Sequence, residues 1–219
     1  MKKSLLIFLV VFSSFTYSQV NDAGMWLSCA FQKNLKGKFT AFLNPVIRLN
    51  ENITEVGSAF LDGGLEYKLN KRFRISLNYR FTGRRRLDDT YSFRNRFYAD
   101  FTSRTKVKKI TFSHRLRIQS QLNDYFTSRN GVIPSYSIRN RAQIKYDINK
   151  KNTASLSAEL WLSPISQLLY STNMRYVGGW EHELNKRSSV TLSYIFQREL
   201  SAVNPVTDYI VSLSFSHSF

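Results

Sequence analysis

Residues 62–81 read DGGLEYKLNKRFRISLNYRF. Apolar and polar residues alternate from Leu65 to Leu69, and after a short polar break the alternation resumes from Phe73 to Phe81. Successive side chains of a β-strand point to opposite faces, so this period of two predicts two strands joined by a tight turn. One face of the hairpin is apolar and rich in aromatic rings, while the other is charged or small and polar.

The same unit recurs along the rest of the chain, and no linker divides it. Eleven alternating segments can be counted, of which the first, residues 25–33, alternates only weakly. A tilted strand needs roughly 9–11 residues to cross a bilayer, and closed bacterial barrels of single chains have even strand numbers. We therefore predict an all-β fold, an antiparallel transmembrane β-barrel of about 10 strands in which residues 25–33 are not a full strand. Twelve strands are the alternative.

The beginning of the chain has the pattern of a secretory signal peptide. Lys2 and Lys3 precede the apolar residues 5–12, and a small, polar stretch ends at Ser18. The apolar run is much shorter than the roughly 20 residues of a membrane-spanning helix. We expect residues 1–18 to be a cleaved signal peptide and residues 19–219 to form the barrel domain. Cys29 is the only cysteine, and we expect it to pack as a small apolar residue on a strand.

The connections between the predicted strands alternate in length. Short turns rich in Lys and Asn follow one strand and longer loops the next, which is the periplasmic-turn and outer-loop pattern of bacterial barrels. Every lysine after the signal segment lies in or within a few residues of a short turn, so we expect one rim to be cationic. The chain ends at Phe219 after an alternating strand, which looks like the carboxy-terminal signal read by the outer-membrane assembly machinery.

The composition restricts the function classes. A formal charge of +17 would suit nucleic acid, but most strand arginines stand singly on the polar face rather than in one patch. A secreted β-sandwich is the structural alternative. Aromatic residues make up 15% of the chain and gather near strand ends, and lysine is scarce on the polar faces. These features favour a barrel in the outer membrane over a sandwich with a solvated face.

Alternate positions along each predicted strand face the interior, and by this rule nine arginines and nine acidic residues lie on the inward face. An unpaired charge in a confined lumen is costly whereas a paired one is tolerated, so we expect ion pairs across strands and an excess of positive charge only at the rims and loops. The alternative is a polar pore or ligand pocket lined by arginine. The candidate ion-pair residues are Arg94, Arg96, Asp100, Arg115, Arg117, Arg139, Arg141, Glu159, Arg175 and Glu181.

The sequence offers little for catalysis. His114, His182 and His217 fall on the apolar face by parity, and the serines beside them in sequence point to the opposite face, which leaves only cross-strand Ser–His pairs open. Cysteine and histidine are too few to suggest a metal site, and there is no Gly-rich phosphate loop. We expect no cofactor and no enzyme, with an outer-membrane lipid-modifying enzyme as an alternative.

Several short motifs are similar to those of a known family. They are Trp26-Leu27, Arg48, residues 114–119 (HRLRIQ), residues 138–141 (IRNR) with Tyr146, and residues 158–160 (AEL). With them the chain resembles the outer-membrane β-barrel family numbered 2490 among domains of unknown function. The resemblance covers nearly all of the chain after the signal segment. It implies a barrel in the outer membrane of a Gram-negative bacterium, but no established activity or catalytic residues.

The expected function is therefore that of a non-enzymatic outer-membrane barrel. We expect it to be structural or narrow, because about ten strands leave an interior that side chains largely fill. Its expected partners are outer-membrane lipid and the assembly machinery, and not nucleic acid. If the lumen conducts, its arginines and the cationic rim predict a preference for anions.

Overall fold

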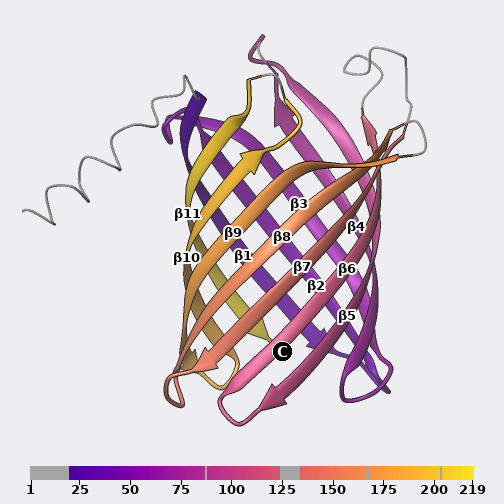
Figure 1. Cartoon of the computed structure of the whole chain (residues 1–219). Helices are drawn as coiled ribbons and strands as arrows, with labels where there is room; N and C mark the ends of the chain where they lie inside the picture. Colours follow the sequence, from indigo (N-terminus) through magenta and orange to yellow (C-terminus); the bar gives the residue numbers. More distant parts are fainter. Residues whose placement is uncertain (1–19, 87, 124–133, 166–167, 203) are drawn as a thin grey trace, which may run out of the picture.

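The computed structural model describes residues 20–86, 88–123, 134–165, 168–202 and 204–219 (Figure 1). The predicted signal peptide, residues 1–18, lies outside them. The described residues form a single closed barrel of eleven strands, and none of them belongs to a helix long and apolar enough to cross a membrane. The strands are β1 (Val20–Asn34), β2 (Phe39–Asn50), β3 (Glu55–Lys68), β4 (Phe73–Arg85), β5 (Tyr91–Val107), β6 (Ile110–Asn123), β7 (Ser135–Asp147), β8 (Asn152–Ile165), β9 (Leu168–Asn185), β10 (Ser188–Glu199) and β11 (Val206–Ser218).

Each strand pairs antiparallel with its neighbours in sequence, which confirms the predicted antiparallel barrel. The prediction of ten or twelve strands is wrong. Residues 25–33 belong to a full strand, β1, and this strand closes the barrel by pairing in parallel with β11, from Val20 opposite Val206 to Gln32 opposite Ser218. An even count is required only when the closing pair is antiparallel, and a parallel pair accommodates an odd one.

The alternation of the sequence has the predicted consequence for the two faces of the wall. Large apolar side chains project from the outside, and Leu77 and Leu156 are about 70% exposed (68% and 70%). Aromatic rings on this face pair across β4 and β5, where Phe81 stacks on Phe93 with ring centroids 5.4 Å apart. Cross-strand aromatic pairs of this kind help to fix the strand register. In a β-sandwich the apolar faces of the two sheets pack against each other, which is the opposite of the apolar exterior found here.

Three of the five short turns share one local structure. Asn70, Asn149 and Asn185 each begin such a turn, and the side-chain Oδ1 of each accepts a hydrogen bond from the backbone N–H two residues later, at 2.8 to 2.9 Å. Asparagine favours tight turns because its side chain can replace a backbone acceptor in this way. In all three cases Lys and a second basic residue follow the asparagine. The turn sequence therefore also places positive charge at the rim.

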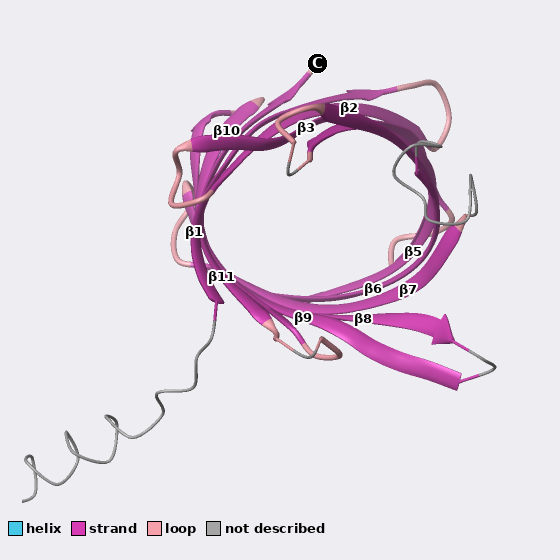
Figure 2. Cartoon of the chain, turned by 90° about the horizontal axis from the view of Figure 1, so that it is seen from above, coloured by secondary structure: helices cyan, strands magenta, loops and turns pink. Residues whose placement is uncertain are grey.

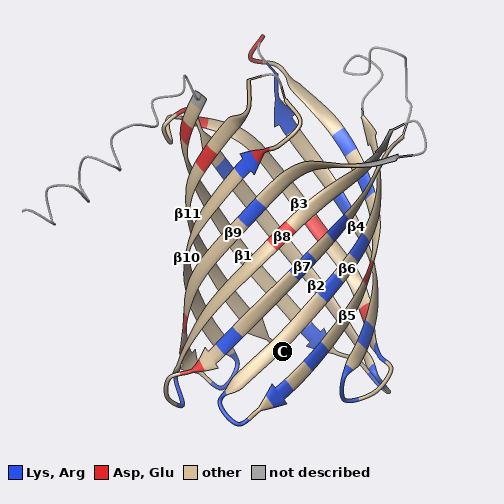
Figure 3. Ribbon diagram, in the orientation of Figure 1, with Lys and Arg blue, Asp and Glu red and all other residues tan. Residues whose placement is uncertain are grey.

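The two rims of the barrel differ. The short turns and the carboxy-terminal end lie at one rim, where the backbone N–H of Phe219 bonds to the carbonyl of Gln32, and Figure 3 shows Lys and Arg gathered there. The longer connections and the start of β1 lie at the other, the loop rim (Figure 1). At the loop rim Arg85 pairs with Glu55 at 2.9 Å and with Asp89 at 2.6 Å, which joins the start of β3 to the loop after β4.

The wall is uneven at the loop rim. The pairing of β7 with β8 ends at Ile138 and Leu162, whereas β8 and β9 remain paired as far as Ile165 and Leu168. The end of this hairpin therefore extends beyond its neighbours, and Figure 2 shows it leaving the outline of the barrel. A register shift between Trp161 and Leu162 marks the place where the hairpin departs.

Candidate functional site: the arginine-lined lumen

The interior of the barrel is polar. The most buried side chains include Asp62, Asp100, Arg117, Arg139 and Glu159, each of which is less than a tenth exposed. All belong to the inward face that the alternation defines. A buried charge is tolerated only when it is paired and hydrogen-bonded, so the partners of these groups decide what the lumen can do.

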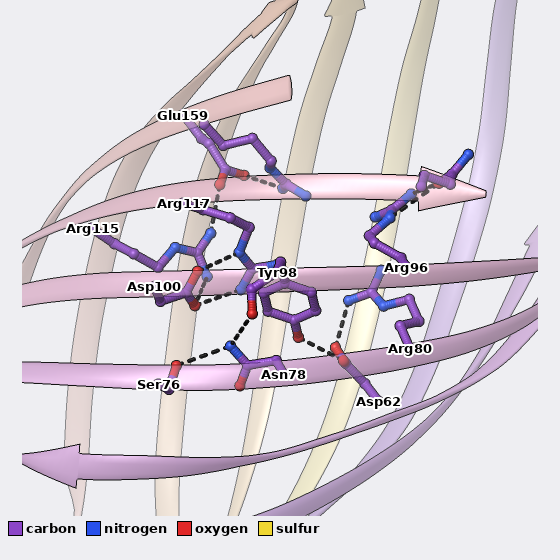
Figure 4. Close-up of polar contacts among 12 residues, drawn as sticks. Asp62, Ser76, Asn78, Arg80, Arg96, Tyr98, Asp100, Arg115, Arg117 and Glu159 are labelled. Atoms are coloured by element: carbon purple, nitrogen blue, oxygen red, sulfur yellow. Dashed lines mark hydrogen bonds and ion pairs between the residues drawn. The ribbon is translucent and has the colours of Figure 1, made fainter. Parts of the chain in front are cut away.

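Arg117 and Asp100 form a two-pronged ion pair between β6 and β5. Arg117 Nε donates to Oδ1 of Asp100 at 2.6 Å, and Nη2 donates to Oδ2 at 2.7 Å. The two residues are directly opposite in the register. A planar guanidinium matches a carboxylate in this geometry, which makes the contact strong and directional. Arg115 lies 3.9 Å from the same carboxylate (Figure 4).

Glu159 on β8 gathers three arginines from three other strands. Its Oε1 accepts a hydrogen bond from Arg115 at 2.5 Å and its Oε2 accepts one from Arg139 at 2.7 Å. Arg175 lies 3.8 Å from Oε2. The side chain of Glu159 is only 4% exposed. Because Arg115 is on β6, its contact with β8 passes over β7, so this carboxylate joins groups across the concave wall as well as between neighbouring strands.

Asp62 on β3 is the third buried carboxylate with an arginine partner. Arg80 Nη2 donates to its Oδ2 at 2.5 Å, and the hydroxyl of Tyr98 donates to its Oδ1 at 2.6 Å. Asn78 donates in turn to the backbone carbonyl of Tyr98 at 3.3 Å. Figure 4 shows these groups side by side on the inner wall. Both oxygens of Asp62 are therefore satisfied by groups from β4 and β5.

Aromatic rings link neighbouring arginines at positions where no acidic residue lies between them. The guanidinium carbon of Arg48 lies 3.8 Å from the ring centroid of Trp26 and 4.8 Å from that of Phe60. Arg80 covers the same Phe60 ring at 4.0 Å. Each such cation–π contact contributes about 0.5–2 kcal/mol, with the higher values at desolvated sites.

A second group of rings closes the circle. Arg139 and Arg175 lie 4.3 and 4.6 Å from the ring centroid of Trp161, and Arg175 also lies 4.9 Å from that of Trp26. Arg117 stacks on Tyr98 at 3.8 Å. The ion pairs and stacked rings thus form an unbroken cycle of contacts, which we call the girdle. Its members are Trp26, Arg48, Phe60, Asp62, Arg80, Tyr98, Asp100, Arg115, Arg117, Arg139, Glu159, Trp161 and Arg175.

The charge of the lumen differs from the sequence-based expectation. A cavity of about 720 Å³ extends from the girdle toward the loop rim and is lined by nine arginines but only five acidic residues. The predicted balance inside, with the excess confined to rims and loops, is wrong for this part of the barrel. Arg48 and Arg84 also face inward, while Glu66 and Glu181 pair near the short turns, with Arg74 and Lys145 respectively.

Of the ten candidate ion-pair residues, six come together in the girdle and four lie elsewhere in the lumen. Asp100, Arg115, Arg117, Arg139, Glu159 and Arg175 come together in the girdle. Arg96 and Arg94 lie nearer the loop rim, where Arg96 donates through Nε to Gln121 at 3.0 Å and Arg94 has no ion pair among the described residues. Arg141 lines the cavity, also without an ion pair in the described part of the chain, and Glu181 bonds to Lys145 at 3.0 Å near the short turns.

Sequence reasoning missed the aromatic members of the girdle. Trp26 and Trp161 have polar neighbours two residues away on the same face, Ser28 and Glu159. A tryptophan that shares the alternating face of polar residues therefore indicates, from the sequence alone, that its ring faces the lumen. Phe60 and Tyr98 carry the same signal, since each lies two residues from a buried aspartate.

The histidines make side-chain contacts, two with asparagine and one with serine. His114 lies 2.8 Å from Oδ1 of Asn140, and His182 lies 2.8 Å from that of Asn152. His217 Nδ1 lies 2.9 Å from the hydroxyl of Ser188, across β10 and β11, which is the cross-strand Ser–His contact that the sequence left open. The ring of His217 also packs edge-on against Phe219 at 4.8 Å. No group of His, Cys, Asp and Glu among the described residues could hold a metal ion.

The fold and the lumen define the class of this protein: a closed, eleven-stranded β-barrel with an apolar exterior and an ion-paired interior rich in arginine. The chain belongs to the family described as "Protein of unknown function (DUF2490)", which matches residues 23–207. This confirms the family resemblance read from the sequence.

Solved structures with a similar fold include two barrels. An anion-selective porin from Comamonas acidovorans has a TM-score of 0.41 at 12% identity; the match covers 84% of this chain and 54% of the porin, so the chain spans about half the porin's length. The β domain of the Bordetella autotransporter Brka has a TM-score of 0.47 at 9% identity, with 80% of this chain and 82% of that domain covered. A search of curated proteins found no match.

Proposed function

We propose that this chain is a non-enzymatic outer-membrane β-barrel whose lumen is narrowed by the girdle and passes at most small anions. The observation that carries the proposal is the unbroken cycle of girdle contacts. Its arginines are held in place both by carboxylates and by stacked rings, so the long side chains are fixed within the lumen rather than folded against the rims.

The exterior supports the membrane location. Isolated apolar residues are common on protein surfaces, but a continuous apolar face around a closed wall is not stable in water. Lipid is the partner that covers it. We place the short cationic turns on the periplasmic side, as in other bacterial barrels, and we propose that the assembly machinery reads Phe219 at the end of β11.

The interior supports a preference for anions. The cavity that begins at the girdle is lined by nine arginines, six of them girdle members, and by five acidic residues, and a charged ring of one sign favours ions of the other. The strand number also fits a narrow lumen, because eleven strands lie much closer to the 8 strands of filled barrels than to the 16–18 of open porins.

Fractionation tests the location. We expect the protein to sediment with the outer membrane and to migrate on gels at different positions before and after boiling, because folded barrels of this kind resist detergent. Recovery as a soluble periplasmic protein would contradict the membrane proposal.

Planar-bilayer recording tests the narrow lumen. We expect the native protein to give little or no current, and any current to favour anions. The double variant Asp100→Ala/Arg117→Ala removes both partners of one girdle pair without leaving an unpaired charge, and should raise the conductance. Glu66→Ala/Arg74→Ala removes a pair outside the girdle and is the matched control. Large, stable, or cation-selective openings of the native protein would overturn the proposal.

The contact between Ser188 and His217 favours the second candidate, a lipid-modifying enzyme. A serine activated by a histidine base is the usual start of acyl transfer, although the described residues show no third group that orients the imidazole. Fatty acid release from phospholipid vesicles by the native protein, and its loss in Ser188→Ala, would establish this alternative.

A further inference from the structure

A smaller cavity overlaps the first on the loop side of the girdle and shares four arginines with it, Arg48, Arg80, Arg84 and Arg96. It has a volume of about 290 Å³, and we call it the vestibule. Its lining includes five arginines from three strands and only two acidic residues, Asp22 and Asp208. The arginines are Arg48, Arg80, Arg84, Arg94 and Arg96.

Most of these arginines have no acidic partner in the part of the chain that the structure describes. Arg80 is paired with Asp62, and Arg96 bonds to the neutral side chain of Gln121. Arg48 is held by aromatic rings, and its Nε, like that of Arg94, is buried without a hydrogen-bond partner among the described residues. Arg84 faces the same cavity from β4. A buried donor without a partner is destabilising, and the two residues that carry these donors both line this cavity, so the cavity offers them to an acceptor.

The two carboxylates of the vestibule do not supply that acceptor. Asp22 accepts hydrogen bonds from the backbone N–H groups of Glu51, at 3.2 Å, and Asn52, at 2.9 Å. Asp208 accepts a hydrogen bond from Gln197 at 2.9 Å. Each is therefore engaged with groups of the wall or the loop. The positive charge of the arginines is left to attract an anion from solution.

We propose that the vestibule binds a small, soluble phosphate compound carrying more than one negative charge. The inference rests on the proposed anion-attracting lumen and names its ligand. One guanidinium can satisfy a planar carboxylate, whereas a tetrahedral phosphoryl group offers oxygens in several directions and can bridge arginines from different strands. Arg84 and Arg94 bind the ligand at the loop side, and Arg48 and Arg96 bind it nearer the girdle.

The size of the vestibule fits this class of ligand. At about 30 Å³ per water molecule, 290 Å³ holds the equivalent of about ten waters. This is enough for a diphosphate group. Trp26 lines the vestibule and contacts Arg48, so a ligand that binds there changes the surroundings of an indole ring.

Tryptophan fluorescence of the folded protein in neutral detergent tests the site. We expect a saturable change on titration with pyrophosphate at low ionic strength, and none with chloride at matched ionic strength. Arg84→Gln/Arg94→Gln should weaken pyrophosphate binding more than tenfold, and Arg94→Lys, which keeps the charge, should weaken it less. Arg74→Gln, near the short turns, is the matched control and should leave the affinity unchanged.

Three results would overturn the inference, of which the first two are the absence of a saturable response to pyrophosphate and equal affinities in the double variant and the control. Displacement of pyrophosphate by phosphatidylglycerol micelles would also overturn it, because the ligand would then be a lipid headgroup. Migration of each variant before and after boiling shows that it is folded. The measurement requires no ion current, so its failure is distinguishable from failure of the narrow-lumen proposal in bilayer recordings.

Discussion

Glu159 shows how strongly single residues are coupled in this lumen. Its carboxylate contacts Arg115, Arg139 and Arg175 together. The remaining contacts of these arginines are to Asp100, to Trp161 and Trp26, and to Gln197. Removing the charge of Glu159 would therefore leave like charges close together in a confined space, where repulsion is poorly screened.

At the residue scale we predict that Glu159→Gln destabilises the barrel. Breaking one side of a buried ion pair typically costs about 3–5 kcal/mol, and water within the cavity would bring the loss toward the lower value. The measurement is the urea midpoint of unfolding in detergent. Glu66→Gln is the control, because Glu66 and Arg74 are about a third exposed and such pairs contribute about 0–1 kcal/mol. Equal midpoints for native protein and Glu159→Gln would show a freely solvated lumen.

At the element scale, the strand that decides the architecture is β1. Its apolar alternation is weak because Gly24 and Ala30 occupy inward positions and Cys29 an outward one, so the sequence does not distinguish it from a partial strand. The structure gives it two complete partners, β2 on one side and β11 on the other. The parallel pair with β11 is the only closure that connects eleven strands into one wall.

We predict that a disulfide forms across this closure. Leu27 and Leu213 are register partners on β1 and β11, and neighbouring strands bring Cα atoms into the 4.4–6.8 Å range that a disulfide requires. In a Cys29→Ser background, Leu27→Cys/Leu213→Cys should cross-link on oxidation of the folded protein. Leu27→Cys/Tyr209→Cys is the control, since the second cysteine is displaced by about 13 Å along the strand. Absence of cross-linking in the first pair would indicate that β1 does not close the barrel.

At the scale of the whole molecule, the odd number of strands places the start of the first strand and the end of the last strand at opposite rims of the barrel. β1 starts at the loop rim, whereas β11 ends beside the short turns. A barrel of ten or twelve strands would bring both ends to the same rim. The periplasmic position proposed above for the short turns would put the start of β1 on the outside of the cell.

This arrangement predicts which residues a membrane-impermeant maleimide reaches on intact cells. In the Cys29→Ser background, Asn21→Cys at the start of β1 should be labelled like Asn52→Cys in a loop. Lys150→Cys in a short turn should be labelled only after the outer membrane is opened. All three positions are exposed. Protection of position 21 together with labelling of position 52 would mean that the start of β1 lies at the periplasmic rim and that the closure is not parallel.

The sequence by itself determined ten of the eleven strands, their two faces and the character of the rims. Alternation depends only on neighbouring residues, so parity correctly placed Arg117, Asp100 and Glu159 inside and Leu77 outside. The Asn-Lys turns are equally local, because the asparagine side chain bonds within its own turn. These features need no information about distant parts of the chain.

The tertiary structure alone decided the closure and the partners within the lumen. The alternation shows which face of the wall a residue occupies. It does not show the position of that residue along the barrel axis, which depends on the tilt and stagger of the strands in the closed barrel. Arg115 bonds to Glu159 although the two lie 44 positions apart in the sequence, and Tyr98 bonds to Asp62 across 36 positions. The excess of arginine around the cavity lies in the girdle itself, where six arginines meet three acidic residues. The stagger places Glu66 and Glu181 near the short turns, where they pair with Arg74 and Lys145 instead.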